Sequence, residues 1–142
     1  MTGLTNLNAI LATLDPVLGE SPYVFASLKN DTTVDVTSLD PLFTFKEEEG
    51  TTVIVHQDVA DKMSLEYLVV FNQITLKVHL SLEAIGLTAS IATELTKHQI
   101  SCNVVAGYYH DHIFVPTAKS QQALEALKEL QRYSDIQLKN LY

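Results

Sequence analysis

The half of the chain from Ile74 to Leu130 carries hydrophobic residues in an ordered series of patterns. Apolar and polar residues alternate from Ile74 to Val78, which predicts a strand with one apolar face. Further strands are expected at residues 100–106 and 113–115, with a tight hairpin turn at 109–111. Two stripes at helical spacing predict helices: Leu87, Ile91 and Leu95, and then Ala123, Leu124, Leu127 and Leu130. The order β-α-β-β-α predicts an α+β fold, in which the helices lie on one face of an antiparallel sheet.

The first half predicts a related set of elements with polar turns between them. A helix is indicated by apolar residues on one face, namely Leu7, Ile10, Leu11 and Leu14, with Pro16 beyond its end. Strands are expected at 23–28, 42–45 and 52–55 and a short helix at 58–63, whereas residues 34–39 fit no single pattern. The closing residues 133–142 keep apolar side chains and are expected to form a last strand or an arm that docks onto a partner.

A repeated order of predicted elements indicates two similar units in tandem. The run Val53-Ile-Val-His-Gln leads into a predicted helix, just as Ile113-Phe-Val-Pro-Thr does. We therefore expect an N-terminal unit at residues 1–70 and a C-terminal unit at residues 71–142. Because the first unit begins with a helix instead of a strand, a strand exchanged between the units, within residues 67–71, is expected to complete it.

Two segments resemble a known family. The runs Ser81-Leu-Glu-Ala-Ile-Gly-Leu-Thr-Ala89 and Ile100-Ser-Cys-Asn-Val-Val-Ala-Gly-Tyr-Tyr-His-Asp-His-Ile-Phe-Val-Pro116 resemble the ACT domain, a small regulatory fold that binds amino acids. More closely, they resemble bacterial proteins in which tandem ACT domains stand alone without an enzyme and have no settled function. The resemblance is specific over the last half of the chain. It implies two ferredoxin-like (βαββαβ) units in tandem, with antiparallel sheets and helices on one face.

Charge and composition exclude several classes of function. The 142 residues include 9 Lys and Arg against 17 Asp and Glu, and the net charge of −8 disfavours binding to nucleic acid or to anionic membranes. No apolar run approaches the roughly 20 residues that span a bilayer, and the first residues do not resemble a signal peptide, so a cytoplasmic protein is expected. The single cysteine, Cys102, excludes an internal disulfide and a Cys-rich zinc site. We expect no cofactor and no metal requirement.

The predicted strand-to-helix turn at Gly86 is the first candidate for a ligand site. Glycine permits backbone conformations closed to other residues, and the N–H groups of the helix that follows can bind a carboxylate. The alternative is that Gly86 only makes the turn. The resemblance implies that a ligand lies at this turn, formed by Ile85, Gly86, Leu87 and Thr88, and against a neighbouring unit. Asn103 is expected on the sheet face opposite the helices, where it binds a ligand or a second subunit, or else is solvated or forms a cross-strand hydrogen bond.

The segment Tyr108–His112 is the second candidate, because two histidines two residues apart on a strand share a face and Asp111 can orient an imidazole. A metal site needs further ligands that the sequence does not place, so a structural role in the hairpin is favoured. Cys102 is expected to be a small buried apolar group. The chain has no nucleophile elbow and no phosphate-binding glycine-rich loop.

These observations favour a noncatalytic regulatory protein that binds a small molecule, with an amino acid as the leading candidate. It is expected to act through interfaces between units or subunits, as a homodimer, and to pass its output to an effector protein. One alternative is an assembly module that has lost ligand binding. The other is an uncharacterised enzyme that uses Tyr109, His110, Asp111 and His112.

Overall fold

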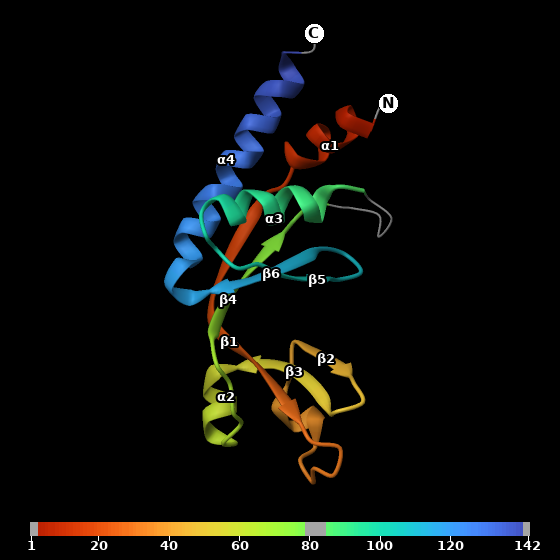
Figure 1. The fold of residues 1–142 in the computed structure, drawn as a ribbon, viewed down its shortest axis with the longest axis vertical. Coiled ribbons are helices and arrows are strands. Elements are labelled where there is room, and N and C mark those ends of the chain that lie inside the picture. The colour runs from red at the N-terminus through yellow and green to blue at the C-terminus, as the bar shows by residue number, and fades with distance from the viewer. Residues whose placement is uncertain (1–2, 79–84, 141–142) are drawn as a thin grey trace. The chain divides into compact units, whose positions relative to one another are not determined.

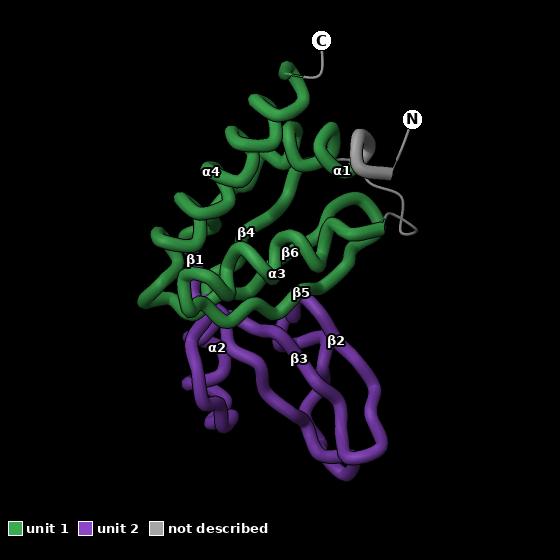
Figure 2. Tube along the Cα trace, turned by 45° about the horizontal axis from the view of Figure 1, so that its top comes forward, with its two compact units in different colours: residues 1–20, 72–142 green, residues 21–71 purple. Residues whose placement is uncertain are grey.

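The computed structural model describes residues 3–78 and 85–140 (Figure 1). The chain folds into two compact units (Figure 2): unit 1 contains residues 1–20 and 72–142, and unit 2 contains residues 21–71. Two strands, β1 (Pro16–Leu28) and β4 (Val70–Leu76), contribute residues to both units. The sequence boundary expected between residues 70 and 71 stays a prediction.

Unit 1 contains the predicted β-α-β-β-α series, which confirms the α+β class for this half of the chain. The remaining elements are α1 (Gly3–Leu11), α3 (Leu87–Lys97), β5 (Asn103–Ala106), β6 (Asp111–Pro116), the 3-10 turn η2 (Thr117–Lys119) and α4 (Ser120–Lys139). Strand β4 is hydrogen-bonded to β6, and β6 pairs with β5 in antiparallel register, with Asn103 opposite Phe114 and Val105 opposite His112.

The predicted apolar stripes form one core in unit 1. Leu87, Ile91 and Leu95 of α3 are buried, as are Leu124 and Leu127 of α4. These side chains share a cluster with the apolar face of β4 and β6: Ile74, Leu76, Ile113 and Val115. Helix α1 adds Leu11, and Leu14 follows it, so that each helix buries the face that the sequence pattern marked.

The last segment of unit 1 is helical, so the strand predicted at residues 133–142 is wrong over its described part, whereas docking of this segment onto a partner stays a prediction. Helix α4 continues to Lys139, with Ser134 buried against the unit. No glycine or proline follows Pro116, and ion pairs between neighbouring turns, Arg132 with Glu129 and Lys139 with Asp135, stabilise the extended helix.

Unit 2 is built from the second part of β1, the 3-10 turn η1 (Val36–Leu39), β2 (Phe43–Lys46), β3 (Thr51–His56) and α2 (Gln57–Lys62). Strand β3 pairs antiparallel with both neighbours, with Val53 opposite Ala26 and Ile54 opposite Phe43. The core of unit 2 is a second apolar cluster: Val24, Ala26, Leu28, Leu39, Val53, Val55 and Ala60.

Two strands of the first half differ from their predicted lengths. The strand predicted at 23–28 is longer and begins at Pro16, whose fixed φ suits an extended chain. Only Val70 and Phe71 of the predicted strand 67–71 are in a strand, the start of β4. Among the described residues, no helix is both long and apolar enough to cross a membrane.

Candidate functional site

The turn before α3 is built around the backbone of Gly86. This residue has φ +91°, in the left-handed region, and its carbonyl accepts the N–H of Ser90 at 3.0 Å, which begins the helix. A Cβ atom at this position would lie 3.5 Å from Leu7 Cδ2, an ordinary contact. The need for glycine therefore comes from the backbone conformation and not from lack of space.

The residues around Gly86 differ in whether their side chains or only their backbone groups are available to a ligand. Leu87 is buried in the core, so only its backbone is available to a ligand, whereas Thr88 is exposed and the Ile85 side chain is 91% exposed. No side chain of a described residue caps α3. The first N–H groups of a helix have no acceptor within the helix, and the helix dipole makes that end favourable for an anion. Residues 79–84, including His79, lie outside the described residues.

Asn103 is the first residue of β5, the strand that follows α3 in the sequence. It is exposed, and its neighbour Val104 packs against the helix-side core, so the Asn103 side chain lies on the other face of the sheet. The Asn103 amide donates a hydrogen bond to the Phe114 carbonyl at 3.5 Å, across the β5–β6 pair. This is the cross-strand bond that the sequence left open as an alternative. A ligand role for Asn103, and for Ile85 to Thr88, stays a prediction.

The segment Tyr108–His112 forms the β5–β6 hairpin. The Gly107 N–H donates to the His110 carbonyl at 2.9 Å, and a Cβ on Gly107 would lie only 2.7 Å from that same oxygen. His110 lies in the turn, as the predicted hairpin at 109–111 expected, so of the two histidines only His112 is on a strand. The rings of Tyr108 and Tyr109 are exposed and meet edge to face at 5.0 Å.

His112 is held on the sheet by β4. Its Nδ1 atom lies 2.9 Å from Gln73 Nε2 and 3.1 Å from Thr75 Oγ1. Because the Gln73 amide nitrogen can only donate, Nδ1 accepts and the neutral ring carries its proton on Nε2. Burial lowers the pKa of His112, and the charges of His110 and Lys77 lower it further against the opposing effect of Asp111.

We expect this lowered pKa to make folding pH-dependent. The unfolded chain takes up a proton on His112 near pH 6.5, whereas the folded chain does so only at lower pH. The unfolded state therefore binds more protons in this window, and the free energy of unfolding falls as the pH decreases through it. Urea unfolding of wild type and His112→Gln at a series of pH values measures the effect. The variant should lose part of the pH dependence; identical pH dependence in both would contradict the assignment.

Cys102 packs against the core of unit 1, as predicted. Burial raises the pKa of its thiol to about 11, so the group stays protonated at neutral pH. A protonated thiol is a poor nucleophile and a poor metal ligand. Within the described ranges, no three His, Cys, Asp or Glu side chains are grouped closely enough to hold a metal ion.

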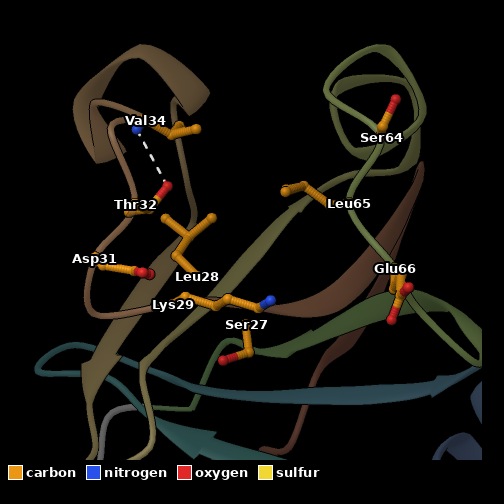
Figure 3. A pocket seen from close by; sticks show the side chains of 9 residues that line it. All are labelled: Ser27, Leu28, Lys29, Asp31, Thr32, Val34, Ser64, Leu65 and Glu66. Atoms are coloured by element: carbon orange, nitrogen blue, oxygen red, sulfur yellow. Dashed lines mark hydrogen bonds between the residues drawn. The ribbon is translucent and has the colours of Figure 1, made fainter.

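The structure also contains pockets that the sequence did not predict. One, of about 380 Å³, lies between α3 and α4 and is lined by Glu94, Lys97 and Glu129 among others. Another, of about 340 Å³, lies in unit 2 and combines Lys29 and Asp31 with Glu66 (Figure 3). No local sequence pattern connects Lys29 and Asp31 to Glu66.

Comparison with known proteins identifies the fold. Sequence models of the ACT domain match the chain twice, over residues 2–72 and 69–129. The crystal structure of VC0802 from Vibrio cholerae, a protein of unknown function and possible transport protein, is 45% identical to this chain, covers 92% of it and 99% of its own chain, and has a TM-score of 0.83. No curated protein matches the chain significantly.

More distant structures share the fold. The ligand-free regulatory subunit of aspartate kinase from Thermus thermophilus is 7% identical over 81% of this chain and 95% of its own, with a TM-score of 0.56. Escherichia coli aspartokinase III, in complex with aspartate and ADP, is 10% identical over 81% of this chain and 32% of its own, with a TM-score of 0.59.

Proposed function

This chain belongs to the ACT-domain family, with two ACT domains in tandem, and from this premise we propose that it is a noncatalytic regulatory protein that binds an amino acid. The observation that carries the proposal is the turn at Gly86. There, a left-handed glycine opens a helix whose first N–H groups no described side chain caps. The resemblance in fold to a regulatory subunit of aspartate kinase, and to an aspartokinase bound to aspartate, supports an amino acid as the class of ligand.

The proposed recognition is directed at the carboxylate of the ligand. The N–H groups of Leu87 and Thr88 donate to it, and the exposed Thr88 hydroxyl offers a further donor. Leu87 anchors the turn because its side chain is 2% exposed and packs in the core. Binding would then favour whichever arrangement of units or subunits completes the site, and the output would pass to an effector protein.

The proposal is tested by thermal unfolding of the full chain against each proteinogenic amino acid. A ligand present at a hundred times its dissociation constant adds about 2.7 kcal/mol to the free energy of unfolding, which a melting curve detects readily. We expect one amino acid, or a few of related chemistry, to raise the melting temperature with saturation. No rise with any amino acid at millimolar concentration would overturn the ligand proposal and favour a role in assembly alone.

We further expect the protein to be a homodimer. In unit 2, the edge strand β2 pairs only with β3 among the described residues and carries two stacked rings, Phe43 and Phe45, at 6.2 Å. The Phe45 ring is 59% exposed, and an exposed apolar edge strand is a site at which another chain can pair. Light scattering at micromolar concentration should give twice the mass of the chain, and Phe45→Lys should lower that mass; a monomer mass for the wild type would contradict the expectation.

A further inference from the structure

The ring of His112 contacts two different elements of unit 1, one on each side. Its Nδ1 atom lies within hydrogen-bond distance of Gln73 and Thr75 of β4, at 2.9 and 3.1 Å. Its opposite edge packs against Gly107, where a Cβ atom would lie 3.3 Å from Nε2 and 3.4 Å from Cδ2. The imidazole therefore connects the turn between β5 and β6 to the neighbouring strand β4.

This turn has little room to adjust by itself. The Gly107 N–H donates to the His110 carbonyl at 2.9 Å, and a Cβ atom on Gly107 would come within 2.7 Å of that oxygen. The turn carries the rings of Tyr108 and Tyr109, which are 82% and 68% exposed. Because closely packed groups transmit a displacement, movement of the His112 ring away from β4 also moves the turn and the two tyrosines.

A proton on Nδ1 does not fit the hydrogen bonds that hold the ring. The Gln73 amide nitrogen can only donate, so protonation of His112 places two donors against each other. If the Gln73 amide turned over, its oxygen could accept this proton, but a charged ring would remain in a half-buried position. Movement of the ring toward water removes both costs.

The charged groups around the ring act mainly in the same direction. Burial lowers the pKa of His112, the charges of His110 in the turn and Lys77 after β4 lower it further, and Asp111 opposes them. A proton is therefore bound more readily when the ring has left its place on β4 than when it is held there.

We propose that His112 is a proton-controlled latch, which holds the turn end of the β5–β6 hairpin, residues 105–112, on β4 when the ring is neutral and releases it when the ring is protonated. Release changes the position of Tyr108 and Tyr109 at the surface of unit 1. The core is retained, because Ile113 and Val115 on the opposite face of β6 stay buried against the helices. The latch does not depend on a ligand at Gly86.

The test is amide hydrogen exchange of the full chain, followed by two-dimensional NMR and expressed as protection relative to an unstructured peptide at the same pH. The released ring takes up its proton near pH 6.5, and the held ring does so only at lower pH. We therefore expect protection at residues 105–112 to fall by up to about tenfold for each pH unit below this value. His112→Gln should abolish the fall, because glutamine does not titrate.

Gln73→Glu keeps the shape of the side chain and reverses its hydrogen bonding. A carboxylate can only accept, so it bonds the Nδ1–H of protonated His112 and holds the ring on β4 in acid. NMR titration of the ring C–H signals should place the pKa of His112 below 6.5 in the wild type and above it in Gln73→Glu. Protection at residues 105–112 should then no longer fall with acid in this variant.

The β2–β3 hairpin of unit 2 provides the internal control. Its turn is closed by the Glu47 N–H to the Gly50 carbonyl at 2.9 Å and contains no histidine. An acid-induced loss of protection at residues 105–112 alone, absent from both variants, supports the latch. Equal loss in the two hairpins would overturn it, because that result reports unfolding of the whole chain. Constant protection in the wild type, or a fall that persists in either variant, would overturn it as well.

Discussion

Gly86→Val is expected to abolish amino-acid binding while the chain still folds. A β-branched residue at φ +91° is strained by roughly 1–3 kcal/mol. Relief of this strain requires the turn to rotate, which moves the N–H groups of Leu87 and Thr88 away from the ligand carboxylate. Isothermal calorimetry with the amino acid found by thermal screening measures the loss, and circular dichroism shows whether the variant keeps its helices.

Two further variants make this test specific. Gly86→Asn should keep most of the affinity, because asparagine enters the left-handed region more readily than valine does. Asn103→Ala should weaken binding with little loss of stability, because the Asn103 side chain is exposed and its hydrogen bond to Phe114 is long, at 3.5 Å. Wild-type affinity in folded Gly86→Val and Asn103→Ala together would exclude the turn as the binding site.

Leu127→Ala is expected to cost about 2–5 kcal/mol in the free energy of unfolding. Leu127 of α4 is fully buried in the core of unit 1, together with Ile91 and Leu95 of α3. Its truncation removes apolar contacts and leaves a cavity that surrounding helices fill only in part. Urea unfolding followed by circular dichroism measures the change.

The neighbouring residue provides the control for this prediction. Lys128 is exposed on the same helix. Lys128→Ala therefore introduces the same helix-favouring alanine as Leu127→Ala but removes no core contact. Its effect should stay within about 0.5 kcal/mol of wild type. Equal unfolding midpoints for Leu127→Ala and Lys128→Ala would show that α4 does not depend on the packing of unit 1.

Elements whose signal is local could be predicted from the amino-acid sequence alone. Leu87, Ile91 and Leu95 recur at helical spacing, and α3 buries those side chains. Gly86 directly precedes α3, and the left-handed conformation that only glycine adopts easily is found there. Periodicity and turn chemistry of this kind act over a few residues, so one segment is enough to reveal them.

Contacts between segments that are distant in the sequence could not be predicted from it and are visible only in the folded chain. The sequence places His112 beside His110, but in the folded chain His112 is held by Gln73 and Thr75, from a strand far away in sequence. Lys29 and Asp31 share a pocket with Glu66 only because the end of β1 and the turn after α2 meet in unit 2. The physical reason is that the periodicity of apolar residues specifies only which face of a helix or strand is buried. Which elements then lie against that face is set by packing between segments that share no local sequence pattern.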